Sequence, residues 1–260
     1  MKRRYSSRLF CSFILSISSL LASAATPEQE LLDAIAKDDT ETVSRLLKNG
    51  TPHTFEDEQT GTTPLMRAVG QLNTDIINSL LRHGAKPDFR TKRGDTALHH
   101  AAYVGRAAIW KTLLKAKPNV NITNEAGGTP LMVAAFIGNV DAIKLLIKAK
   151  AKIDVEMPDG NTALLLAARG GAEVERAKER RDVVLRLIKA GADPNHRNRE
   201  KHNALYYAVT NEDEKMVQTL IENGAKITKD AAEDRETWET TKSSEDSRIL
   251  KRLEAASQRL

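Results

Sequence analysis

The sequence predicts an all-α solenoid, in which helix-turn-helix units stack in one continuous row. Three observations predict this fold class. A short motif opening with Thr recurs every 33 residues, the apolar residues after each copy have helical spacing, and the 260-residue chain is only 4% aromatic with one cysteine. One cysteine cannot form an intrachain disulfide. The core must therefore come from packing of aliphatic side chains between neighbouring units.

Residues 1–24 have the layout of a secretory signal peptide. Four basic residues precede position 9, residues 9–21 are uncharged, and Ala22-Ser23-Ala24 supplies the small side chains that a signal peptidase accepts. The uncharged run is shorter than the ~20 residues that span a bilayer as a helix. We expect cleavage after Ala24 and no stable membrane anchor afterwards. Retention of the segment as an anchor is the alternative.

Cleavage would change both the charge and the thiol content of the chain. The whole sequence has 40 basic and 35 acidic residues, a formal charge of +5, but four of the bases lie in the N-terminal segment, which leaves 36 against 35. Cys11 would leave with the same segment, and a thiol-free product suits an oxidising compartment. We therefore expect a periplasmic or secreted protein. A charge near +1 argues against a nucleic-acid partner.

Five copies of one motif mark the starts of the repeats. The first four begin 33 residues apart and the fifth follows after 41, so eight extra residues lie near 171–182. The five copies begin at Thr63, Thr96, Thr129, Thr162 and Asn203.

Each copy predicts two short helices. The opening Thr is a good N-cap, and Pro64 and Pro130 occupy a first helical turn, where no amide donor is missed. A second helix has apolar residues at i, i+3 and i+4 and ends at a glycine, such as Gly84 or Gly191. A polar loop containing glycine then reverses the chain before the next copy.

These residues resemble the ankyrin repeat, whose 33-residue unit starts with T-P-L-H-x-A, over about residues 28–227. The resemblance implies that His99, at the family's His position, hydrogen-bonds the backbone of the neighbouring turn. Lys117 and Lys150 stand where the helix-ending Gly is usual, so either those turns close differently or a lysine holds a positive φ. Lys201 replaces the glycine at the tip of the fifth loop, which leaves the geometry of that turn open.

The repeats divide the rest of the chain. We expect an N-terminal capping repeat over 28–60, five ankyrin-type repeats over 61–227 and C-terminal capping helices over 228–260. Ser243 with Asp246 resembles a capping box, and a following helix would seal the open end of the stack. Its apolar face is formed by Ile249, Leu250, Leu253, Ala256 and Leu260.

The extra residues fall in the second helix of the fourth repeat. Ala172 to Ala190 predicts one continuous helix whose first turns carry many charges, among them Arg180 and Arg181. The first interpretation is an outer helix lengthened by two turns, with its mixed charges solvated. The alternative is a protrusion that docks a partner.

The sequence contains none of the motifs that carry common chemistry. It has no HExxH, no GxSxG, no phosphate-binding glycine loop and no calcium loop. The adjacent pair His99-His100 points about 100° apart on a helix, which does not suit one metal ion. We therefore expect no enzymatic activity, no cofactor and no metal site.

By the same resemblance, the loop tips and the exposed side of the first helices form a concave face that binds a partner. Tyr103 and Phe136 lie 33 residues apart, so we expect both rings in one column on adjacent repeats, as a candidate binding hot spot. The alternative is that one or both rings pack under the adjacent helix. The expected contact residues are Lys92, Arg93, Asp95, Tyr103, Val104, Glu125, Phe136, Ile137, Asp159, Asn161, Arg169, Arg199 and His202.

The sequence thus predicts an exported, monomeric protein that binds a protein partner of unknown identity, as scaffold, inhibitor or protective partner. A secreted effector that binds host proteins is one alternative. An enzyme or small-ligand module with a site built across repeats is another.

Overall fold

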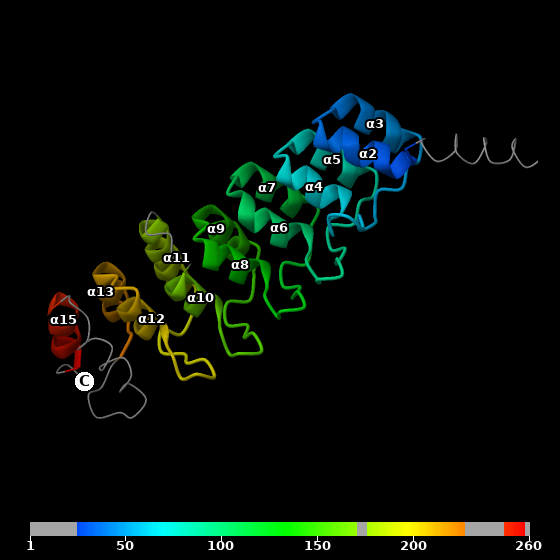
Figure 1. The fold of residues 1–260 in the computed structure, drawn as a ribbon. Coiled ribbons are helices and arrows are strands. Elements are labelled where there is room, and N and C mark those ends of the chain that lie inside the picture. Colours follow the sequence, from blue (N-terminus) through cyan, green and yellow to red (C-terminus); the bar gives the residue numbers. More distant parts are fainter. Residues whose placement is uncertain (1–24, 171–175, 227–246, 258–260) are drawn as a thin grey trace, which may run out of the picture.

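The computed structural model describes residues 25–170, 176–226 and 247–257, and within these ranges the backbone forms helices and no strand. The helices lie in pairs along an elongated stack, with α2 at one end and α15 at the other (Figure 1). The predicted all-α solenoid is confirmed. The expectations for residues 1–24, Ser243, Asp246 and Leu260 lie outside the described residues.

Each pair contains a first helix and a second helix. The first helices are α2 (Pro27–Ala36), α4 (Pro64–Gly70), α6 (Ala97–Val104), α8 (Pro130–Ile137), α10 (Ala163–Arg169) and α12 (Ala204–Thr210). The second helices are α3 (Thr40–Lys48), α5 (Thr74–Arg82), α7 (Ala107–Lys115), α9 (Val140–Lys148), α11 (Ala177–Lys189) and α13 (Glu214–Glu222), and α15 (Ser247–Ser257) follows them.

The first helices begin as the motif predicts. The Oγ1 atom of Thr63 accepts a hydrogen bond from Met66 N at 3.1 Å, and Pro64 follows in the first turn. Small residues such as Ala101 and Ala134 are fully buried where first helices pack on one another, α4 on α6, α6 on α8 and α8 on α10. Small side chains allow this close approach, so each unit is buried by its two neighbours.

Second helices end at residues with positive φ. Gly84 has a φ of +96° and Gly191 of +106°, the left-handed region that glycine enters at little cost. Lys117 and Lys150 hold φ values of +52° and +65° at the equivalent turns, and Lys201 holds +68° in its loop. Of the two possibilities for Lys117 and Lys150, a lysine in the left-handed region is therefore correct.

The inserted segment folds against the stack. Gly170 ends α10 with a φ of +54°, and α11, which is visibly longer than its neighbours, is described from Ala177 onward, while 171–175 lie outside the described residues (Figure 1). Arg180 is only 8% exposed, although the sequence placed its charge in solvent. That expectation was wrong because Arg180 packs across Gly170 and Gly138, where a Cβ would lie 2.6 and 3.2 Å from its side chain.

Ion pairs tie the last elements together. Arg181, also expected in solvent, donates to the carboxylate of Asp213 at 3.0 and 3.1 Å, which joins α11 to the start of α13. Arg252 of α15 lies 2.8 Å from the carboxylate of Glu214. On the predicted apolar face of α15, Ile249 and Leu253 are fully buried, and the helix packs on α13. Within the described ranges, no helix is long and apolar enough to cross a membrane.

Candidate protein-binding face

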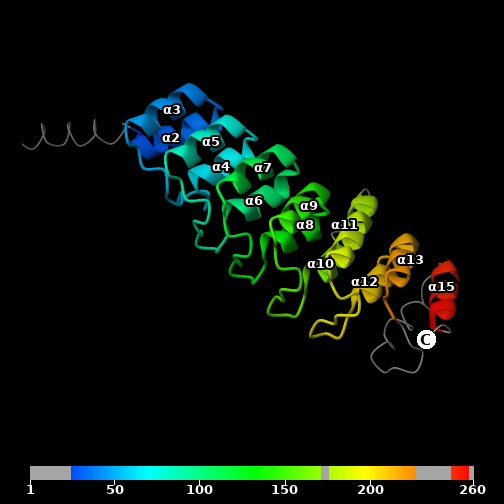
Figure 2. The same ribbon diagram turned by 180° about the vertical axis from the view of Figure 1, so that it is seen from behind.

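The loops before the first helices form a row along one side of the stack, and Figure 2 shows the same row from behind. Backbone hydrogen bonds join two pairs of successive loops. Glu125 N donates to Arg93 O at 2.9 Å, and Arg199 N donates to Asp159 O at 3.0 Å. The carboxylate of Glu56 accepts from Lys92 N at 2.6 Å. The tips are therefore held at a fixed spacing.

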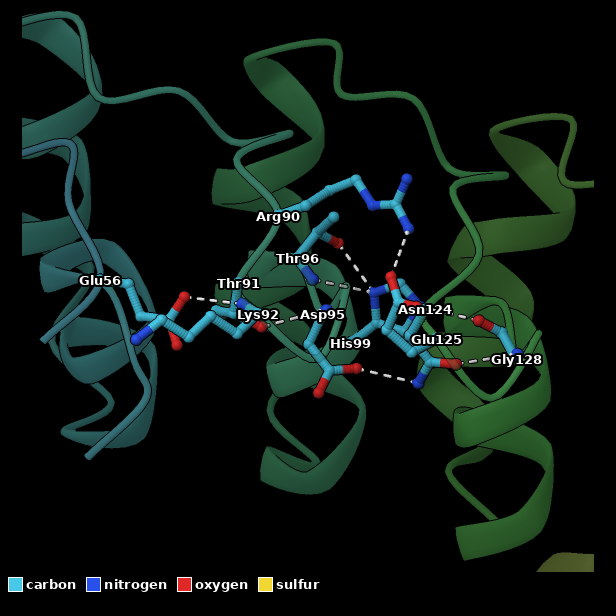
Figure 3. A network of polar contacts seen from close by, with 10 residues as sticks. All are labelled: Glu56, Arg90, Thr91, Lys92, Asp95, Thr96, His99, Asn124, Glu125 and Gly128. Carbon is cyan, nitrogen blue, oxygen red and sulfur yellow. Dashed lines mark hydrogen bonds and ion pairs between the residues drawn. The ribbon is translucent and has the colours of Figure 1, made fainter. Parts of the chain in front are cut away.

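Asparagine side-chain amides lie at the base of these loops. Asn124 donates from Nδ2 to Asp95 Oδ1 at 2.9 Å and accepts from Gly128 N at 2.9 Å (Figure 3). In the fifth repeat Asn198 donates to Asn161 Oδ1 at 3.1 Å. Asn161 is 2% exposed, so its place among the expected contact residues was wrong. Its side chain, held also by Asp159, connects two loops instead of facing a partner.

His99 connects two repeats, as the family position implies. Its Nδ1 atom accepts from Thr96 N at 3.1 Å, and its Nε2 atom lies 3.1 Å from Gly128 O (Figure 3). Because a backbone amide can only donate, Nδ1 must be the acceptor, and Nε2 carries the proton that it donates to Gly128. Burial lowers the pKa of His99 below its ordinary value of 6.5, which favours this neutral form.

Tyr103 and Phe136 are exposed, at 70% and 42% of their surfaces. They lie in the last turns of α6 and α8, which pack side by side, so the two rings belong to adjacent repeats as expected. Val104 and Ile137 are half-buried next to them in sequence. We call Tyr103, Val104, Phe136 and Ile137 the aromatic strip. In the described part of the chain, its two rings are the large hydrophobic side chains that folding leaves exposed.

The other expected contact residues differ in exposure. Asp95 is half-buried, and its carboxylate accepts from Asn124. His202 is half-buried too, and its ring stacks on Tyr206 with centroids 3.7 Å apart and an interplanar angle of 7°. The remaining ones are exposed, namely Lys92, Arg93, Glu125, Asp159, Arg169 and Arg199.

Sequence reasoning missed the aromatic contacts around His202. Tyr206 and Tyr207 lie edge to face with centroids 5.5 Å apart, and Tyr207 Oη accepts from Asn198 at 3.0 Å. Burial raises the pKa of Tyr207 above 10. The adjacent tyrosines, at positions where the other repeats carry Met-Arg, His-His, Met-Val or Leu-Leu, were the available signal.

A pocket of about 370 Å³ adjoins the aromatic strip. Its walls come from the end of α6, the turn between α8 and α9, and the first turn of α11. Arg176, the N-cap residue of α11, and Glu179 in its first turn line the pocket together with Tyr103 and Ile137. These α11 residues were not expected at the site, because the insertion has no counterpart in the other repeats. In the described ranges, no three His, Cys, Asp or Glu side chains are grouped to hold a metal ion.

Two curated human proteins share part of the sequence. The 2-5A-dependent ribonuclease is 39% identical over 88 residues, which are 34% of this chain and 12% of that protein. SH3 and multiple ankyrin repeat domains protein 2 is 35% identical over 115 residues, 43% of this chain and 6% of that protein. The chain therefore matches only a small part of the length of these relatives, and the similarity transfers no activity.

Solved structures resemble the fold over most of its length. The ankyrin repeat protein EF0377 aligns with a TM-score of 0.65 at 30% identity and covers 74% of this chain and 96% of its own. The ankyrin repeat domain of Bcl-3 aligns with a TM-score of 0.71 at 22% identity, over 86% and 97%.

The family model for ankyrin repeats (3 copies) matches residues 31–124 and 117–198, more than half of the chain. Ankyrin repeats are generally protein–protein interaction modules. The match agrees with the helix pairs, the loop row and the inter-repeat bond of His99. The chain belongs to the ankyrin-repeat family.

Proposed function

We propose that this protein is exported and acts without catalysis, by binding a protein partner through the aromatic strip and the neighbouring loop tips. The observation that carries the proposal is the exposure of Tyr103 and Phe136 on adjacent helices. An aromatic side chain left in water keeps a large apolar area available for burial, and aromatic residues dominate interface hot spots.

The fixed geometry around the strip supports this use. Backbone hydrogen bonds join two pairs of neighbouring loops, and the carboxylate of Glu56 accepts from Lys92 N between a third pair, so these tips need little ordering when a partner binds. Arg93 and Arg169 are exposed on the repeats before and after Phe136, where charges can set the orientation of a partner. We propose that the chain works as a monomer, in which this face is free.

Export is supported by the layout of residues 1–24 and by the position of the single cysteine, Cys11, within that segment, so that the rest of the chain carries no thiol. The mass of the protein recovered from its source tests this part. A mature N-terminus at Ala25 is expected, and a mass that includes residues 1–24 would refute cleavage. Fractionation then separates a periplasmic scaffold, inhibitor or protective partner, which stays with the cell, from a secreted effector, which is found in the medium.

Affinity capture from the native envelope tests the binding itself. The wild-type chain is compared with the double variant Tyr103→Ala/Phe136→Ala. We expect capture of the partner to be lost and the melting temperature to change little, because both rings are exposed. A large fall in melting temperature would show that the rings serve packing, and undiminished capture would place the binding surface elsewhere.

A further inference from the structure

The pocket beside the aromatic strip exists because α11 is longer than the other second helices. Its first turn lies against the turn between α8 and α9, where Arg176 Nη1 donates to Ile137 O at 3.4 Å. A Cβ at Gly138 would lie 3.7 Å from Glu179 Cβ, so the helix passes close over this turn. The insertion therefore supplies a wall that other repeats lack.

Two carboxylates and one guanidinium line the pocket, and one of the two carboxylates is left without a partner among the described residues. Asp141, Arg176 and Glu179 are the charged residues that line it. Arg176 bonds to the carbonyl of Ile137, and the carboxylate of Asp141 lies 3.2 Å from Lys144 Nζ at the exposed rim. Glu179 is exposed, and the structure gives its carboxylate no partner within the described ranges. A carboxylate without a partner in a pocket favours a cationic ligand.

The other walls suit the stem of a long basic side chain. Val104, Ile137 and Val140 are half-buried and give apolar surface, and Tyr103 contributes a ring that is 70% exposed. Arginine and lysine side chains bury their methylene groups on such surface while the charged head stays in water. A cation over the face of a tyrosine gains further attraction from the ring quadrupole.

We propose that this pocket receives one arginine or lysine side chain of the protein partner, with its charged head beside Glu179 and its stem along the aromatic strip. The inference rests on the proposed function and deepens it, because it names the chemistry that the partner presents next to Tyr103. It also assigns a role to the insertion, which forms part of the binding site.

Titration of the 15N-labelled full chain followed by NMR tests the pocket alone. The probe is N-acetyl-argininamide, and N-acetyl-citrullinamide is the matched neutral probe of nearly the same shape. We expect saturable shifts at the amides of Gly105, Gly138 and Val140, with citrulline binding about tenfold more weakly, because it loses both the ion pair and the cation–π contact. Equal binding of the two probes, shifts confined to other repeats, or no saturable shifts would overturn the inference.

Two variants assign the charge effect. Glu179→Gln should weaken argininamide binding about three- to fivefold, whereas Glu41→Gln, an exposed glutamate on the distant α3, should leave it unchanged. Equal effects of the two substitutions would contradict the assignment to Glu179. If argininamide does not bind but capture of the partner still depends on Tyr103 and Phe136, the pocket is rejected and the proposed function stands. If argininamide binds but capture of the partner does not depend on these two residues, the proposed function is rejected and the pocket stands.

Discussion

His99 donates from Nε2 to the carbonyl oxygen of Gly128 at 3.1 Å, and this bond joins the first helix of one repeat to the loop of the next. The same ring accepts from Thr96 N and so also helps to cap its own helix. The other repeats carry Met66, Met132, Leu165 and Tyr206 at the equivalent position. Among the five repeats, a histidine makes this connection at the interface between α6 and α8.

Replacing His99 by Met should destabilise the protein by about 1–3 kcal/mol, because Gly128 O and Thr96 N would lose a partner in a buried site. Urea unfolding followed by circular dichroism measures this. Met66→Leu, a nearly volume-conserving change at the same position of another repeat, is the control and should cost less. A smaller loss for His99→Met than for the control would contradict the role of the bond.

Acidification should destabilise the fold through His99 and its neighbour His100. Burial lowers the pKa of His99 and of His100 below 6.5, so the unfolded chain binds more protons than the folded chain once the pH falls below that value. The free energy of unfolding should be highest above pH 6.5. It should decrease as the pH falls from 6.5 toward the pKa values that the two histidines have in the folded chain. Denaturant midpoints in this range measure it, and the double variant His99→Met/His100→Gln should show a flatter profile. A profile equally steep in the double variant would assign the effect to other groups.

Much of this structure follows from the sequence, because the 33-residue period fixes which residues share a position. The N-cap at Thr63 and the helix ends at Gly84 and Gly191 were predicted from that period, and the inter-repeat bond of His99 from the resemblance to the ankyrin repeat. Whether Tyr103 would face solvent was left open, since the position alone does not say how the last turn of a first helix meets its neighbour.

The insertion marks where such reasoning stops. Arg180 looked like one charge among many, yet it is buried because Gly138 and Gly170, far apart in sequence from each other, leave space for its side chain. The charge pattern of α11 carries no information about this tertiary contact. For the same reason the pocket lined by Arg176 and Glu179 could not be predicted, since it forms between α11 and a different repeat.

Lys150→Gly should stabilise the protein by about 1 kcal/mol, because Lys150 holds a φ of +65° that is costly for a side chain with Cβ. Thermal unfolding measures the gain. Lys148→Gly is a matched control two residues earlier, in the last turn of α9, and should destabilise by a similar amount. If both substitutions shift the melting temperature in the same direction, the positive φ is not the cause.

Gly170→Ala should destabilise the protein by about 1–3 kcal/mol, because φ +54° with ψ 170° is a conformation nearly restricted to glycine. The new Cβ would also lie 2.6 Å from Arg180 Cδ. Chemical denaturation measures the loss. Gly70→Ala serves as control, since Gly70 ends α4 without a positive φ and a Cβ there meets no atom within 4 Å. That change should be neutral or slightly stabilising, and an equal loss at both sites would contradict the explanation.

Site-specific photo-crosslinking tests the central claim most directly, since it reports which surface touches the partner. A photoreactive phenylalanine analogue is placed at Tyr103, at Phe136, or at the exposed Lys111 or Lys215 of the second helices α7 and α13. Binding through the aromatic strip predicts covalent adducts with the partner from positions 103 and 136 and none from 111 and 215. Adducts formed only from the second helices would contradict the claim.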